Sequence, residues 1–242
     1  MSITTNPGIF EVDLVFPRNA TYSPQALTPI VWALQNPAMA SPLTASITWN
    51  LWEGNNRTSP GSVGGGAIEL SLMNVSSSEP LLVPEFVNTV AYPDGEWTLT
   101  WTLSIYNCSQ LEGRYQDITR SDSTVFTISK SGQDPDLVAA TAADECGAME
   151  AYAFNLTSFG DACGYLGPTP ATNPCAVTIN STATSSLYAA ATAYACSPLS
   201  RNENVTCPTI TSAGNPTFQS RIATGPVLLM LLITMTSFIH FG

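Results

Sequence analysis

The chain has 242 residues, of which 10% are charged, and its formal net charge is −11 at pH 7. This length accommodates one ordinary domain with tails, or two small domains. An acidic surface repels phosphate, which argues against a nucleic-acid partner, and the charged fraction lies well below the usual quarter of a cytosolic protein.

Residues 9–130 show the period of two that is typical of β-strands. The clearest run is "GEWTLTWTLSIYNC", in which large apolar residues alternate with Thr and Ser behind the turn sequence Pro93-Asp94-Gly95. Further alternating series lie at 10–16 (with Glu11 and Asp13 between the apolar positions), 30–34, 47–51, 68–72 and 124–128. Six to eight such strands predict an all-β fold, an antiparallel β-sandwich of the immunoglobulin-like kind.

From residue 131 the alternation fades and Cys becomes frequent, so we interpret 131–207 as a disulfide-braced C-terminal extension without a core of its own. The stretch "TSSLYAAATAYAC" predicts a short helix over 184–196. Thr184 or Ser185 would cap it, and Leu187, Ala191 and Tyr194 would share one face. A linker over 208–224 leads to a hydrophobic tail over 225–242.

The cysteines indicate disulfides rather than a metal site. Their number is even, no C-x-x-C pair occurs, and the chain has a single histidine, so zinc is improbable and we expect neither metal nor cofactor. Three disulfides imply an oxidising compartment, and spacing alone does not choose among the 15 possible pairings. The six residues are Cys108, Cys146, Cys163, Cys175, Cys196 and Cys207.

Glycosylation sequons agree with export. Asn-x-Ser/Thr occurs seven times, more often than composition alone predicts. The asparagines are Asn19, Asn56, Asn74, Asn107, Asn155, Asn180 and Asn204. The stretch "MSITTNPGIFEVDLVF" has neither a basic nor an apolar leader region, so we expect a signal peptide that is missing from this chain.

Three interpretations compete for the apolar tail: a buried core helix, a single membrane span, and a signal for a glycosylphosphatidylinositol (GPI) anchor. Small residues at 212–214, a polar spacer and a hydrophobic end favour the anchor, attached at Ser212. The run is slightly short for a span and no basic flank follows it. Removal of the tail would also remove His240, which would exclude Ser–His–Asp catalysis and histidine-ligated metals.

Several stretches resemble an uncharacterised fungal family of secreted proteins that carries only a domain-of-unknown-function label. They are "LVFPRNATYSP", "PIVWALQNP", "GEWTLTW", "DACGYLG" and "NPCAV", of which "FPRN…TY" and "NPCAV" are the more specific. The resemblance implies a secreted fungal protein and brings no catalytic residues with it.

One candidate ligand site stands out on the strand around 46–52. Trp52 shares the polar side of this strand with Asn50, where its ring could stack on a sugar while Asn50 or Glu53 bonds the hydroxyls. The alternative is that Trp52 packs under a loop at the strand end.

Carboxylate pairs are the acid–base groups that remain for catalysis. The candidates are Asp94 with Glu96, Asp134 with Asp136, and Asp144 with Glu145, all of which are also typical of solvated turns.

Three functions follow, in order of preference. The first is a non-catalytic surface or cell-wall glycoprotein, outside the plasma membrane and held there by a lipid anchor or a single span. The second is a carbohydrate-binding module or lectin with cell-wall polysaccharide as its partner, and the third is a secreted hydrolase that uses two carboxylates. The sequence contains no signal for an oligomeric state.

Overall fold

The computed structural model describes residues 7–55, 62–73, 75, 80–108, 115–160 and 163–208. Residues up to Cys207 form one compact unit, and of the second unit, Pro208–Gly242, only Pro208 is described. Asn56, Asn74, Ser212 and the hydrophobic tail therefore lie outside the described residues. Within the described ranges, no helix is long and apolar enough to cross a membrane.

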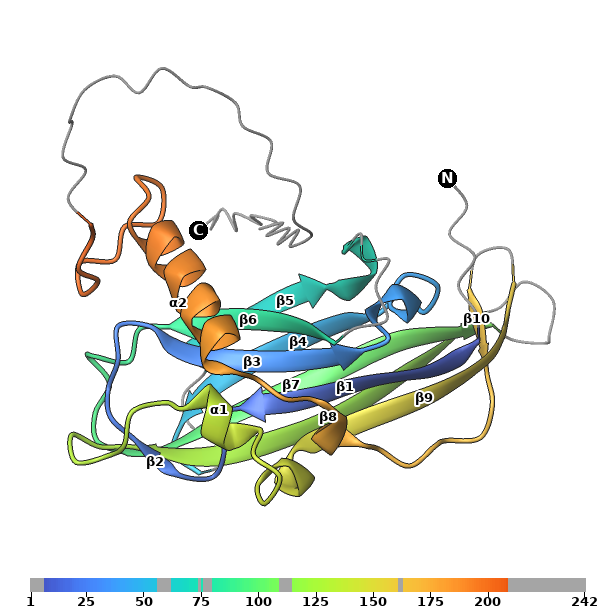
Figure 1. Cartoon of the computed structure of the whole chain (residues 1–242), viewed down its shortest axis with the longest axis horizontal. Helices are drawn as coiled ribbons and strands as arrows, with labels where there is room; N and C mark the ends of the chain where they lie inside the picture. Colours follow the sequence, from blue (N-terminus) through green and yellow to red (C-terminus); the bar gives the residue numbers. More distant parts are fainter. Residues whose placement is uncertain are drawn as a thin grey trace. The chain divides into compact units, whose positions relative to one another are not determined.

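The described elements are mainly strands (Figure 1). The strands are β1 (Gly8–Phe16), β2 (Thr21–Tyr22), β3 (Thr28–Gln35), β4 (Ser46–Glu53), β5 (Gly64–Glu69), β6 (Leu81–Val87), β7 (Gly95–Cys108), β8 (Tyr115–Ile128), β9 (Glu150–Phe159) and β10 (Gly164–Leu166). The helices are α1 (Leu137–Ala140) and α2 (Ser181–Ala195), with 3₁₀ turns η1 (Pro37–Met39), η2 (Leu70–Leu72), η3 (Cys146–Ala148) and η4 (Pro174–Ala176). The prediction of a mostly β chain with a short helix near its C-terminal end is confirmed.

The strands pair in one continuous sheet of order β2-β8-β7-β10-β9-β1-β3-β6, with β4 joined to β7 and β5 joined to β4. The strands β9, β1, β3 and β6 pair antiparallel, and so do β8, β7, β4 and β5. Short β10 links the two groups, antiparallel to β9 and parallel to β7. An immunoglobulin-like sandwich consists of two separate sheets, whereas this link joins all ten strands into one. The immunoglobulin-like sandwich therefore stays a prediction.

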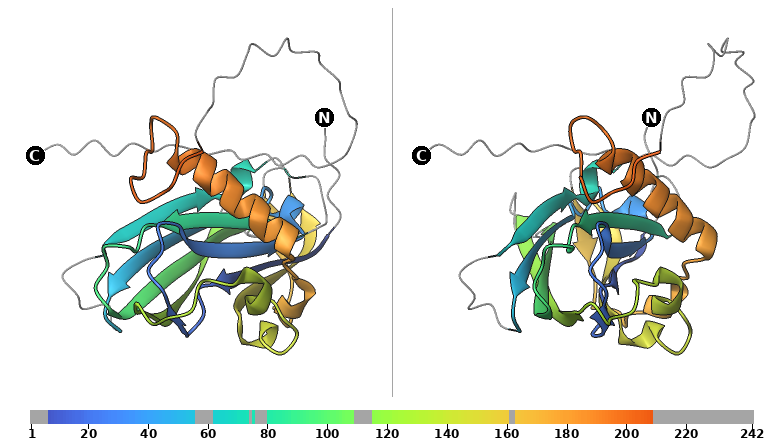
Figure 2. Two further views of the ribbon diagram at one scale, coloured as in Figure 1. Left: turned by 60° about the vertical axis from the view of Figure 1, so that its left-hand side comes forward. Right: turned by 90° about the vertical axis from the view of Figure 1, so that its left-hand side faces the viewer.

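The two groups of strands face each other across the main core (Figure 2). Trp32 of β3 and Trp101 of β7 have ring centroids 6.5 Å apart although their strands do not pair. In β7 the predicted alternation is confirmed, because its apolar positions from Trp97 to Ile105 are all buried. Burial of these large side chains is the main favourable contribution to folding, at roughly 1.5–3 kcal/mol each.

The predicted strand at 68–72 is wrong in its second half. The strand β5 ends at Glu69, and Leu70–Leu72 form a 3₁₀ turn that leaves Leu72 exposed. The backbone N–H of Ser71 donates to the carbonyl of Ala45, which draws the chain out of the β4–β5 ladder.

The region after residue 131 packs against the outward side of β1, β3 and β6. Residues 131–149 and 167–195, which we call the cover, contribute Leu137, Val177, Ile179 and Leu187 to the same hydrophobic cluster as the strands. Between the two halves of the cover, β9 pairs with β1 along seven residue positions. As a result, β1 and β3 are buried on both sides.

The six cysteines form three disulfides, as predicted, and the pairs are Cys108–Cys163, Cys146–Cys175 and Cys196–Cys207. The first ties the end of β7 to the start of β10, and the second joins the two halves of the cover. The third links the end of α2 to the segment that follows it.

Two details of the helix prediction are wrong. The cap of α2 is Asn180, whose side-chain oxygen accepts from the backbone N–H of Ala183, because the helix begins three residues earlier than predicted. Its buried side is formed by Leu187, Ala191 and Ala195, whereas Tyr194 is exposed. Tyr194 is seven residues after Leu187, a spacing that the helical period also places on this side, so periodicity does not account for its exposure.

Candidate functional site on the open face of the sheet

The outward side of β4, β7 and β8 carries rows of polar side chains that the cover does not reach. Strand register aligns Asn50 with Thr100 and Ser123, and Thr48 with Thr102 and Ser121. We call this surface the open face; its residues are Ser46, Thr48, Asn50, Trp52, Thr98, Thr100, Thr102, Ser104, Thr119, Ser121, Ser123 and Val125.

Trp52 lies at one end of the open face and is half-buried, so it does not pack fully under a loop. Its indole N–H donates to the hydroxyl of Thr100, 3.3 Å away on the neighbouring strand. The other tryptophans of the chain, Trp32, Trp49, Trp97 and Trp101, are all buried in the core. Trp52 is therefore the one tryptophan with a ring accessible to a ligand.

The structure brings Asn50 and Trp52 onto the same side of β4, since alternate residues of a strand share a side. Glu53 is exposed at the end of β4 and, by the same alternation, belongs to the opposite side. The predicted trio is thus divided, and the groups nearest to Trp52 on the open face are hydroxyls.

These hydroxyls are held by hydrogen bonds along and across the strands. Thr102 and Ser121 bond to each other at 2.8 Å, and Thr98 donates to the carbonyl of Gly54 at 2.6 Å. Thr48, Thr119 and Ser121 are exposed and keep lone pairs for a further partner. The open face therefore offers a neutral array of donors and acceptors with one aromatic ring at its end, and the exposed hydroxyls of Thr48, Ser121 and Thr119 lie further along the strands from that ring.

None of the five sequon asparagines in the described part of the chain lies on the open face. Asn19, Asn180 and Asn204 are exposed elsewhere, and Asn155 is half-buried on β9. Asn107, on β7, has its side-chain oxygen bonded to the backbone N–H of Leu166 at 3.0 Å. Asn19 lines the same hollow as Ser123 and Val125, so a glycan there would adjoin one edge of the open face.

The predicted carboxylate pairs are exposed, and Glu96 lies near the start of β7. Asp136 accepts from the backbone N–H groups of Val138 and Ala139 and so caps α1. Asp134 accepts from the side chains of Ser23 and Gln25. The pairs Asp94 with Glu96 and Asp144 with Glu145 are also exposed, and none of these residues lines either hollow described in the structure.

The larger of these hollows, of about 290 Å³, lies between the end of β1 and the edge of β8. Glu150 lines it together with Arg18 and Thr124. Its two carboxylate oxygens accept from the indole N–H of Trp101 at 2.8 Å and from the hydroxyl of Thr124 at 2.5 Å. The sequence carried no signal for this arrangement, and Glu150 is the one carboxylate in the lining, which falls short of the pair that glycoside hydrolysis uses.

Nearby, burial and the charges of Asp122 and Glu150 raise the pKa of Tyr152 to about 12. This phenol therefore stays protonated over the physiological range. It donates to Asp122 at 3.5 Å and packs against the ring of Trp101, and both contacts connect β9 with the β7–β8 group.

A family model described as "Domain of unknown function (DUF7136)" matches residues 5–207. The chain belongs to this family. The match ends at Cys207, which is also the last residue of the compact unit and the partner in the last disulfide. No curated protein and no solved structure matches the chain.

Proposed function

We propose that this protein is a non-catalytic extracellular glycoprotein that binds cell-wall polysaccharide through the open face. The observation that carries the proposal is the half-buried ring of Trp52 beside a neutral array of Ser and Thr hydroxyls. An aromatic ring that packs on the apolar side of a sugar, with hydroxyls that bond its rim, is a general solution for a polar ligand of this kind.

The surroundings of the open face support the same proposal. The open face lies on one of the two facing groups of strands, which we take to be the layers of a β-sandwich. It lacks sequons among the described residues, whereas Asn180 and Asn204 belong to α2 and the segment behind it. Within the described part of the chain, no sequon therefore stands between these hydroxyls and a polymer.

The proposed location is the exterior of a fungal cell. Three disulfides support an oxidising compartment, since such bonds are rare in the cytosol. The sequence pattern over 212–242 supports a GPI anchor at Ser212, with a single membrane span as the alternative. The protein would then be displayed on the membrane or wall, next to the polymers that it binds.

The experiment is a pull-down of the full chain, produced with its disulfides and glycans, on insoluble chitin, cellulose and β-1,3-glucan. Trp52→Ala should weaken binding to the bound polymer at least about tenfold, because loss of a packed ring costs on the order of 1.5–3 kcal/mol. Trp52→Phe should retain part of the affinity. Tyr194→Ala, which removes an exposed aromatic ring from α2, is the matched control and should bind normally.

Unchanged binding of Trp52→Ala would remove the open face from the proposal. If the protein binds none of these polymers, the proposed function would be reduced to that of a surface glycoprotein that recognises no polysaccharide.

A further inference from the structure

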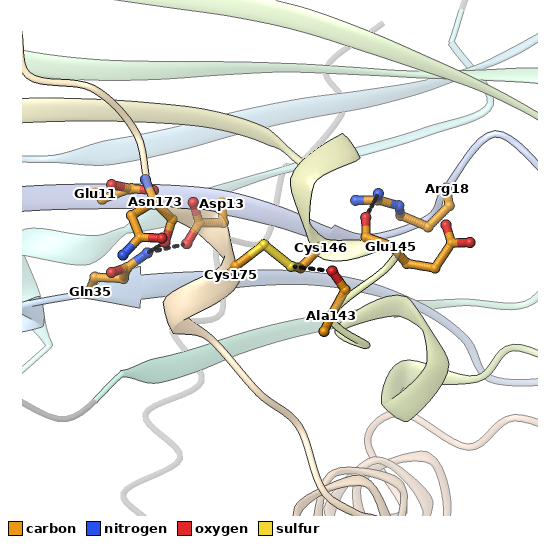
Figure 3. Close-up of a disulfide and its surroundings, with 9 residues drawn as sticks. All are labelled: Glu11, Asp13, Arg18, Gln35, Ala143, Glu145, Cys146, Asn173 and Cys175. Carbon is orange, nitrogen blue, oxygen red and sulfur yellow. Dashed lines mark hydrogen bonds between the residues drawn. A yellow bond between two sulfur atoms is a disulfide. The ribbon is translucent and has the colours of Figure 1, made fainter.

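Two carboxyl groups are buried side by side on β1. Glu11 and Asp13 lie on the side of β1 that faces the cover, and their exposed fractions are 2% and 0%. Figure 3 shows them beside Gln35 of β3, Asn173 of the cover and the Cys146–Cys175 disulfide. Neither Glu11 nor Asp13 belongs to the open face, and neither lines the hollow that contains Glu150.

Three hydrogen bonds connect this pair to the cover. The backbone N–H of Asn173 donates to Oε1 of Glu11 at 2.7 Å. The side-chain amide of Gln35 donates to Oδ2 of Asp13 at 3.0 Å and to the carbonyl of Asn173 at 2.9 Å. Oδ1 of Asp13 is buried without a partner. An unbonded carboxylate oxygen is costly in a protein interior, so this atom marks a missing proton or cation.

Among the described residues, the groups that face the pair carry no positive charge. On β1 the two carboxyls are the titratable groups, and the strand neighbours on the same side are Gln35 and Ala33 of β3 and Ala153 and Ala151 of β9. The cover contributes Asn173 and the disulfide, neither of which titrates here. The nearest cation drawn in Figure 3, Arg18, lies beyond the disulfide, where it donates to the carbonyl of Glu145 at 2.8 Å.

We propose that Glu11 and Asp13 share one proton, and that this proton holds the 173–177 segment of the cover against β1, so that the cover is firmly seated in acid and loosens as the solution becomes alkaline. A protonated Asp13 can donate to Glu11, which leaves one negative charge for the N–H of Asn173. Without the proton, two like charges face each other under the cover with too few donors.

The direction of titration agrees with this arrangement. Burial is the largest cause that raises the pKa of Asp13, to about 8; the bond from Gln35 lowers it, and the hydrogen bond and charge of Glu11 raise it. A folded-state pKa above the unfolded value of 3.8 means that the folded chain binds the proton more tightly. The stabilisation is therefore complete below about pH 4 and is lost as the pH rises through about 8.

The test is chemical unfolding of the full disulfide-bonded chain between pH 4 and pH 9. Asp13→Asn supplies a permanently neutral group of the same size, with Asp117→Asn on the exposed edge of β8 as a charge-matched control. Relative to Asp13→Asn, the folding equilibrium constant of the wild type should fall by up to about tenfold per pH unit between pH 4 and pH 8. Asp117→Asn should parallel the wild type.

A second measurement on the wild type does not depend on any variant folding. Native-state hydrogen exchange should show the Asn173 amide losing protection as the pH rises from 6 to 9, after correction for intrinsic exchange. The Tyr106 amide, which lies outside the cover and donates to the carbonyl of Leu43, should keep its protection.

Two outcomes would overturn the proposal. One is parallel pH profiles of Asp13→Asn and Asp117→Asn with constant protection at Asn173. The other is recovery of alkaline stability on addition of millimolar CaCl₂, which would make a bound cation, rather than a proton, the partner of the pair.

Discussion

The outward sides of β1 and β7 have the same alternating pattern and opposite surroundings. On β1 the residues between the apolar positions are Glu11 and Asp13, and both are buried beneath the cover. On β7 the corresponding residues are Thr and Ser, and most stay accessible on the open face. The charged side is thus the enclosed one and the neutral side is the open one, the reverse of what polarity alone predicts.

This difference shows that a period of two assigns residues to sides of a strand without telling what lies over each side. The cover reaches β1 from residues more than a hundred positions away in the sequence, through contacts such as that between Asn173 and Glu11. Changes to the cover should therefore affect stability, and changes to the open face should affect binding alone.

Loss of the Cys146–Cys175 disulfide, which joins the two halves of the cover, should lower the free energy of unfolding more than the substitutions described after it. The pair is separated by 29 residues, and chain-entropy arguments give a cost of about 3.5 kcal/mol for Cys146→Ala with Cys175→Ala. Loss of Cys196–Cys207, separated by 11 residues, should cost about 2.8 kcal/mol. Denaturant unfolding of both double variants measures the difference, and a smaller cost for the first pair would mean that it does not fasten the cover.

A Thr→Val substitution should lower the free energy of unfolding more in the cover than on the open face. Thr141 is buried in the cover, where its hydroxyl accepts from the backbone N–H of Ile179 at 2.9 Å. Thr141→Val leaves that N–H unbonded and should lower the free energy of unfolding by about 1–3 kcal/mol. Thr102→Val on the open face should change it by less than about 0.5 kcal/mol. Equal losses in thermal or denaturant unfolding would contradict the contrast between the two sides.

Loss of the N-terminal cap of α2 should have a smaller effect on the free energy of unfolding. Asn180→Ala removes both the cap of α2 and a sequon, and the lost cap should cost about 1 kcal/mol. Asn180→Asp keeps a capping oxygen and removes the sequon alone. If the two variants unfold at the same denaturant concentration, the cap contributes nothing to the stability of the cover.

The strands with a clear alternation of apolar and polar residues were predictable, and those without it were not. In β7 and β4 the apolar and polar sides differ, so their positions and the accessible place of Trp52 follow from alternation. In β9 the buried residues Ala153 and Phe154 are adjacent, so the period is lost and the strand was missed. The strand β6 was missed too, and it contains Pro84, which disfavours a strand assignment.

The burial and the hydrogen-bond partners of the interior carboxyl groups could not be predicted from the sequence either. Nothing local distinguishes Glu11 and Asp13 from solvated acids on an edge strand, because their burial depends on a segment near residue 173. Glu150 likewise acquires its two donors, Trp101 and Thr124, from strands that are distant in the chain. In contrast, the disulfide count needed only an even number of cysteines and no metal spacing.

Oxidative footprinting of tryptophan in the full chain, with and without the polysaccharide that it binds, tests the central claim most directly. Trp52 should be oxidised in the free protein and protected in the complex, while the four buried tryptophans should remain unmodified in both. Equal oxidation of Trp52 in free and polymer-bound protein would contradict the account, because the ligand would then lie somewhere other than the open face.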